Sequence, residues 1–144
     1  SAVAVSGTNT TSEEILATVP LPKNFLARNG TLEVETQWTT TAANAKTFNF
    51  RLGTTGVSST SLGSKAITTE ATLRLSLSTA NRNNDASQSS AVTFMGATSV
   101  TFSSGTTSID TSADLNLYIT SLKATGTDTV TLERYTVRII GGAP

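Results

Sequence analysis

Three observations predict an all-β domain, an antiparallel sandwich, jelly roll or barrel of about eight or nine strands. Apolar and polar residues alternate with a period of two in nearly every apolar segment. Turn-forming Gly, Pro, Asn and Asp interrupt these segments about every 8–12 residues. No segment keeps the spacing of an amphipathic helix for more than about two turns.

The alternation is clearest over residues 31–38, where Leu32, Val34, Thr36 and Trp38 share one side and the residues between them are polar. The same pattern predicts further strands at Glu13–Val19, Ala45–Leu52, Glu70–Ser78, Ala91–Met95, Ala113–Leu122 and Val130–Ile140. We expect the strand Glu13–Val19 to stop at Pro20, because proline cannot donate a ladder hydrogen bond.

The last predicted strand changes parity in its middle. Val130 and Leu132 share one face, whereas Tyr135, Val137 and Ile139 continue on the other parity. An extra residue in one strand produces this change, because it shifts every later side chain to the opposite face. The sequence therefore predicts a β-bulge at Glu133 or Arg134.

The domain boundaries follow from where the alternation begins and ends. We expect an extended arm or linker over residues 1–12, one sandwich domain over 13–140 and a flexible tail over 141–144. Deletion of the arm should then leave the fold intact. Residues 23–28 are expected to form a single helical turn that closes one end of the core. Asn29–Gly30 is expected to supply a turn with a positive φ.

Composition limits the chemistry available to the chain. It has no Cys and no His, so thiolate chemistry is absent and the commonest metal ligand is missing. Ten basic residues balance ten acidic ones, so there is no charge excess for nucleic acid. Charged residues make up 14% of the chain, and Thr and Ser about a third. Such a surface is typical of β proteins in assemblies or outside cells.

No residue pattern indicates an enzyme. Serines are abundant, but no His can activate one, and no Lys lies in a nucleophile motif. Glu33 with Glu35, or Asp110 with Asp114, could supply the two carboxylates of a glycosidase. The simpler interpretation of Glu33 and Glu35 is a solvated strand face that pairs with cations such as Arg51.

Binding sites are weakly indicated as well. Asn83-Asn84-Asp85, which Asp110 could join, offers oxygen ligands for Ca²⁺, but the spacing matches no ordered calcium loop and a polar loop is the favoured interpretation. We predict no cofactor and no metal. Trp38 has the parity of the core. Tyr118 has the opposite parity to Leu117 and Ile119, so it is expected to point outward, toward a sugar or a neighbouring subunit.

Several stretches resemble a known class of module. They are TSEEILATVPLP at Thr11–Pro22, NGTLEV at Asn29–Val34, KTFNFRLG at Lys46–Gly53 and YTVRII at Tyr135–Ile140. Their order resembles β-sandwich modules of tailed-bacteriophage virion proteins, found in tail fibres, tailspikes and head fibres or decorations. The specific part of the resemblance covers residues 11–53.

The resemblance implies a jelly-roll-like domain, usually a homotrimer, exposed on a virion surface. Such modules bind host-surface glycans or other virion proteins, and they share no catalytic motif, so the resemblance assigns no site residues. A non-enzymatic virion structural protein for host attachment or capsid decoration is therefore the leading hypothesis. The alternative is a monomeric carbohydrate-binding module of a secreted bacterial protein, with Tyr118 as its exposed aromatic residue.

Overall fold

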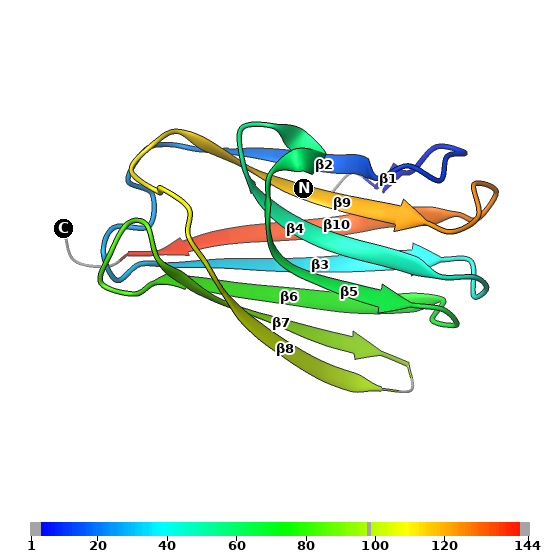
Figure 1. Cartoon of the computed structure of the whole chain (residues 1–144). Coiled ribbons are helices and arrows are strands. Elements are labelled where there is room, and N and C mark those ends of the chain that lie inside the picture. Colours follow the sequence, from blue (N-terminus) through cyan, green and yellow to red (C-terminus); the bar gives the residue numbers. More distant parts are fainter. Residues whose placement is uncertain (1–3, 98, 142–144) are drawn as a thin grey trace.

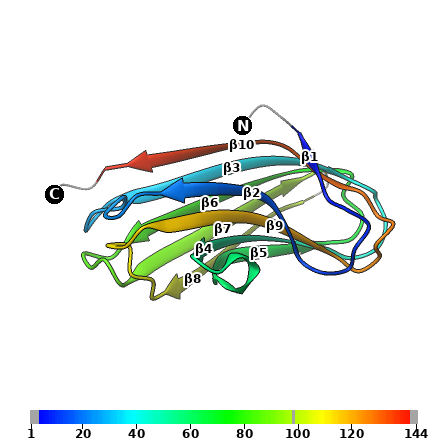
Figure 2. The ribbon, with the colours of Figure 1, turned by 90° about the horizontal axis from the view of Figure 1, so that it is seen from above.

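The computed structural model describes residues 4–97 and 99–141 and shows two antiparallel sheets packed face to face (Figures 1 and 2). In this part of the chain no helix is long and apolar enough to cross a membrane. The strands are β1 (Val5–Ser6), β2 (Glu14–Leu21), β3 (Thr31–Thr40), β4 (Lys46–Gly53), β5 (Thr60–Ile67), β6 (Thr72–Asn81), β7 (Gln88–Gly96), β8 (Val100–Thr107), β9 (Leu115–Lys123) and β10 (Val130–Ile140), with a 3₁₀ turn η1 (Gly56–Ser58).

The larger sheet has the order β1-β10-β3-β6-β7-β8, and the smaller one has the order β2-β9-β4-β5. Every pair of neighbouring strands is antiparallel. The predicted antiparallel, jelly-roll-like sandwich is confirmed. The sequence analysis missed β5 and β8, whose apolar residues are few and alternate with small polar ones.

The core lies between the two sheets and consists of the side chains of one parity from each strand. Trp38, fully buried as predicted, packs against Phe48 of the opposite sheet with ring centroids 4.6 Å apart. The Trp38 Nε1–H donates to the Thr36 hydroxyl at 2.8 Å, so its polar atom is satisfied inside the core.

The bulge in β10 sets which face each half of this strand presents. Leu132 pairs with Trp38 and Arg134 with Gln37, so Glu133 is the extra residue, at one of the positions expected from the change of parity. Before it, Val130 and Leu132 are buried in the core. After it, Tyr135 and Val137 pack against the same core, while Arg134 turns to the outer face.

The expectation that the first long strand stops at Pro20 was wrong. Strand β2 runs through Pro20 to Leu21, with Pro20 opposite Asn116 and Leu21 buried. Because β2 is an edge strand with β9 as its one ladder neighbour, the missing N–H of Pro20 costs no ladder bond.

Residues 23–29 form irregular turns rather than the expected helical turn, and Asn24 and Ala27 adopt positive φ values of 61° and 43°. These turns do close one end of the core, because Phe25 and Leu26 are buried in it. Gly30 does not adopt the expected positive φ. It is needed because a Cβ there would lie 1.7 Å from the Leu26 carbonyl oxygen.

Residues 5–8, expected to belong to an arm, are extended but lie against the sandwich. Val5 pairs with Leu132, and the Gly7 N–H donates to the Val130 carbonyl at 2.9 Å. The carbonyl of Thr8 accepts a hydrogen bond from the buried ammonium group of Lys123, which also lies 3.8 Å from Glu14. The domain therefore begins before residue 12.

Lys123 pairs in register with Lys46, so two buried ammonium groups lie at the same end of the smaller sheet. Lys46 makes an ion pair of 3.2 Å with Asp128 and donates to the carbonyls of Ala43 and Asn44. Buried charges are tolerated only with such partners. These lysines consequently hold the surrounding loops and residues 7–8 in place.

Deleting residues 1–8 should destabilise the domain, contrary to the expectation from sequence. The deletion removes the β1 ladder and leaves Lys123 with fewer acceptors, which we expect to lower the free energy of unfolding by ~1–3 kcal/mol. Urea denaturation followed by circular dichroism measures this. Deleting residues 1–4 alone, which leaves Thr8 in place, is the matched control, and equal stability of the two truncated chains would contradict the role given to residues 5–8.

Candidate functional site

On the outer face of the six-stranded sheet, several adjoining hollows bring charged side chains and exposed apolar groups together. Its middle strands place side chains in rows that cross the sheet at right angles to the strands. One row runs through Arg134, Gln37, Arg74, Met95 and Val100. The next runs through Thr136, Glu35, Ser76, Thr93 and Phe102, and a third through Arg138, Glu33, Ser78, Ala91 and Ser104.

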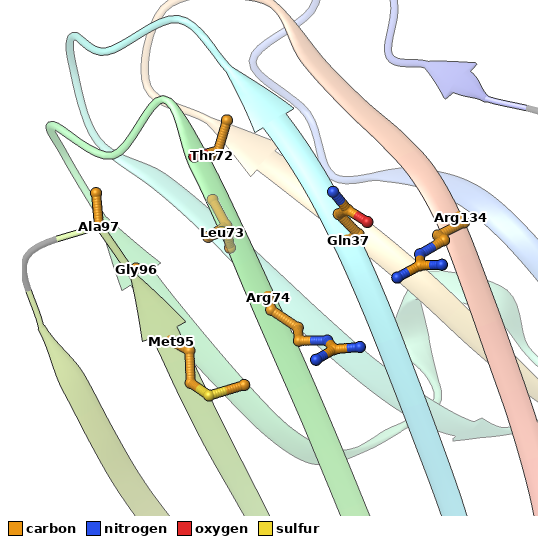
Figure 3. A pocket seen from close by; sticks show the side chains of 8 residues that line it. All are labelled: Gln37, Thr72, Leu73, Arg74, Met95, Gly96, Ala97 and Arg134. Carbon is orange, nitrogen blue, oxygen red and sulfur yellow. The ribbon is translucent and has the colours of Figure 1, made fainter.

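The first row lines an open hollow of about 380 Å³. Figure 3 shows Arg74 from β6 and Arg134 from β10, with their guanidinium groups reaching toward β3 from either side of Gln37. Met95 lies on the far side of Arg74 and is 37% exposed. The hollow thus brings planar hydrogen-bonding groups beside an apolar side chain.

A second, smaller hollow of about 170 Å³ continues over β3 and β10. It is lined by both arginines of the first hollow and by Glu35, Thr136 and Arg138. Arg74 lies 3.7 Å from Glu35, and both side chains are more than 40% exposed, so this ion pair contributes little to stability. These groups remain accessible to a ligand.

A third hollow of about 260 Å³ extends toward β8. Glu33 and Glu35 lie on one side of it and Phe102 on the other, and the small side chains Ser76, Ser78, Ala91 and Thr93 form its floor. Phe102 is 67% exposed, which is unusual for an aromatic ring on a strand. Together the three hollows form a shallow groove with a charged side and an aromatic side.

The chemistry of this groove is that of non-covalent binding. Carboxylates accept hydrogen bonds from hydroxyl groups, guanidinium groups donate them in a planar fork, and an exposed ring offers an apolar contact face. Among the described residues no three His, Cys, Asp or Glu side chains are grouped to hold a metal ion. We name this surface the groove face.

Tyr118 is not part of the groove face. It lies on β9 in the smaller sheet, outside the core cluster as its parity predicted, but it is only 6% exposed. Its ladder partners are Thr18 and Arg51, and η1 contacts β2, β4 and β9 on this side. Tyr118 thus leaves the core face as predicted, but the expectation that it is accessible was wrong, because parity cannot show whether another segment covers a sheet face.

The predicted pairing of Glu33 and Glu35 with Arg51 was also wrong, because these residues belong to different sheets. Arg51 instead binds Glu13, with its Nε and Nη2 each donating at 2.7 Å to one carboxylate oxygen. Asn49 donates to the same carboxylate at 2.9 Å, and so does the Thr120 hydroxyl. The polar side chains of this cluster, on the outer face of the smaller sheet, thus hydrogen-bond to one another.

The contacts of Glu13 set its protonation. Partial burial pushes the pKa of Glu13 upward, but the hydrogen bonds from Arg51, Thr120 and Asn49 and the charge of Arg51 outweigh it, so the pKa lies below its usual value. A carboxylate with a lowered folded pKa stabilises the fold above its unfolded pKa. That stabilisation is lost as the pH falls through the folded pKa.

The proposed calcium ligands serve the loops themselves. The Asn84 side chain accepts a bond from the Ala86 N–H at 2.8 Å, and the Asp85 carbonyl accepts one from the Thr111 N–H at 2.9 Å. Bonds from the Ser112 hydroxyl and N–H lower the pKa of Asp110. Asp114 accepts from the Lys23 N–H at 2.7 Å. The polar-turn interpretation accounts for these residues.

Sequence reasoning missed the roles of Arg74, Arg138 and Phe102. Arg74 and Arg138 each alternate with apolar residues, so their outward direction could be read from the sequence. Their convergence could not, because the pairing of β10 with β3 and of β3 with β6 joins segments far apart in the chain. Phe102 lies on a strand that was not predicted.

Replacing Glu13 with Gln should remove an acid-sensitive contribution to stability. At neutral pH we expect the free energy of unfolding to fall by ~1–3 kcal/mol, because charged hydrogen bonds become neutral ones. The difference from the native chain should shrink below about pH 4, the usual range for Glu. Thermal melting between pH 3 and 7 measures it. Glu35→Gln, which alters only an exposed pair, should change little; a matching pH dependence in both variants would contradict the assignment.

No family model matches the sequence, and no curated protein matches it. Solved structures with a similar fold include lectin I from Ulex europaeus, which is 10% identical with a TM-score of 0.47 over 95% of this chain and 85% of that chain. The seed lectin of Lotus tetragonolobus is 8% identical, with a TM-score of 0.47 over 100% of this chain and 96% of that one.

Two further similar structures come from microbial systems. The CBM2 module of the evolved Dit protein of Lactobacillus casei BL23 phage J-1 is 8% identical, with a TM-score of 0.45 over 85% of this chain and 67% of that chain. An alginate lyase from Alteromonas sp. 272 is 8% identical, with a TM-score of 0.43 over 85% of this chain and 78% of that chain.

Proposed function

We propose that this chain is a non-enzymatic carbohydrate-binding module that attaches a virion to a glycan-bearing host surface. The observation that carries the binding role is the groove face, where Glu35 lies in the same row as the exposed Phe102 ring and the exposed Arg74 and Arg134 lie in the adjacent row. Sugars present hydroxyl groups at their edges and apolar C–H faces, so this combination suits them.

The shape of the groove face supports a polymer rather than a small molecule. The three hollows adjoin one another across strands β10 to β8, and they share lining residues such as Gln37, Arg74 and Glu35. A closed pocket would bury most of a small ligand, whereas an open run of subsites admits a chain. The virion setting rests on the resemblance of residues 11–53, and repetition of weak sites on a particle would supply avidity.

Replacing Phe102 with Ala should weaken glycan binding without unfolding the chain. The ring is largely exposed, so its loss removes a contact face for sugar but little core packing. We expect an affinity loss of about tenfold, equivalent to ~1.4 kcal/mol, for oligosaccharides selected by a glycan array. Isothermal titration measures it. Val57→Ala, which removes an exposed apolar side chain on η1, is the control. Absence of glycan binding by the native chain would refute the proposal.

A second role in assembly is favoured by strand β8. It is the outer edge of the six-stranded sheet, spans eight residues without charge or proline, and is exposed on both faces over nearly its whole length. Unprotected edges of this kind pair with strands of other chains. Other edges are interrupted by charge or proline: β2 carries Pro20, β5 carries Lys65, and β10, which β1 pairs only at Thr131 and Leu132, carries Arg134 and Arg138. We propose that β8 contacts a neighbouring copy in the expected homotrimer at a surface other than that copy's β8, because β8–β8 pairing would give a two-fold dimer.

A charge on β8 should disrupt this assembly. Multi-angle light scattering of the native chain is expected to give a stable mass of three times 14.9 kDa. Ser104→Lys should shift the mass to that of one chain, because a lysine on the edge disfavours strand addition. Thr127→Lys, the same change in the loop between β9 and β10, should not. A native monomer would leave the monomeric carbohydrate-binding module as the better account.

A further inference from the structure

One hollow of the groove face carries a local surplus of positive charge, which bears on the class of glycan it binds. The hollow over β3 and β10 is lined by three guanidinium groups and one carboxylate, a balance of +3 − 1 = +2. The whole chain has ten basic and ten acidic residues and no net charge, so this surplus is local. A neutral sugar gains little from it.

The arginines of this hollow are not used by the fold. Arg74, Arg134 and Arg138 are all exposed, and Arg74 has one exposed ion pair, at 3.7 Å, with Glu35. Arg134 and Arg138 make no ion pair with any residue that the structure describes. Arg51, by contrast, is held bidentately by Glu13 at 2.7 Å. The guanidinium groups on the groove face are therefore free to bind an external anion.

Their arrangement fits a planar or tetrahedral oxyanion. Arg74 and Arg134 extend from strands on either side of β3 and reach toward each other over Gln37 (Figure 3). Guanidinium groups bind carboxylate and sulfate through paired N–H donors, which gives both affinity and direction. Gln37 lies between the two arginines in the row, and its amide can donate a further hydrogen bond.

We infer that the groove face binds an acidic glycan, with a carboxylate or sulfate group of one sugar held between Arg74 and Arg134. This inference rests on the proposed carbohydrate-binding function and adds the ligand class. The row that contains Phe102 is two residues, about 7 Å, along the strands from the arginine row. A neighbouring sugar of the same chain can then lie over Ser76 and Thr93 against the ring.

The direct test compares probes that differ in charge alone. Oligogalacturonate is titrated against its methyl ester, and dextran sulfate against dextran, by isothermal titration at two salt concentrations. We expect the native chain to prefer an acidic probe at least tenfold over its neutral partner, with the preference reduced by salt. The first pair reports carboxylate recognition and the second reports sulfate recognition. Equal affinity for charged and neutral forms in both pairs would overturn the inference.

Variants assign the effect to the two arginines. Arg74→Gln and Arg134→Gln should each lower acidic-glycan affinity by about five- to twentyfold, a clearly larger loss than for the neutral probe, and Arg74→Lys should restore only part of it. Arg82→Gln, an exposed arginine in the loop between β6 and β7, is the matched control. An equal loss in Arg82→Gln would mean non-specific attraction and would overturn the inference. Thermal melting confirms that each variant is folded.

The outcomes separate this inference from the proposed function. If neutral glycans bind and Phe102→Ala weakens them while the arginine variants have no effect, the acidic-ligand inference fails and the carbohydrate-binding role stands. If neither charged nor neutral glycans bind the native chain, both fail.

Discussion

The single extra residue at Glu133 determines both the core and the groove face. Without a bulge at Glu133, regular pairing would turn Arg134 and Arg138 into the core and expose Tyr135 and Val137 to water. With it, the apolar residues on both sides of the step reach the same core. The outer face receives Glu133 and Arg134 in succession, and Glu133 is fixed there by the Thr39 hydroxyl at 2.5 Å. A local defect in one ladder thus supplies one wall of the candidate binding surface.

The unequal size of the two sheets explains where the exposed apolar groups lie. Four strands cannot cover six, so β8 projects beyond the smaller sheet and is exposed on both faces, with β5 in contact along part of it. Phe102 and Val100 lie on the outer face of this strand, away from the smaller sheet, and are 67% and 69% exposed. Strand β8 therefore carries both the aromatic ring of the groove face and an unpaired edge. The proposed glycan contact and the proposed subunit contact can both lie on this strand.

Period-two alternation predicted the sandwich, the burial of Trp38 and the parity change in β10, because each depends on side-chain direction along one strand. It failed where a second segment decides the outcome. Tyr118 has an outward parity but lies on a face that η1 contacts, and residues 5–8 lack any apolar pattern yet are held by a buried ammonium group. The groove face was missed for the same reason: Arg74, Arg134 and Phe102 lie on three strands whose register no local pattern specifies.

The outer faces of the two sheets differ in whether their polar side chains already have hydrogen-bond partners within the chain. On the smaller sheet, Glu13 and Arg51 neutralise each other at 2.7 Å and Asn49 completes the cluster, so an incoming ligand would have to displace good internal bonds. On the larger sheet, three arginines and one carboxylate line the hollow over β3 and β10, and the small side chains of β6 and β7 leave room beside them. Binding energy is available only where the folded chain has left hydrogen-bonding capacity unused. That difference, more than the presence of arginine on either face, places the candidate site on the six-stranded sheet.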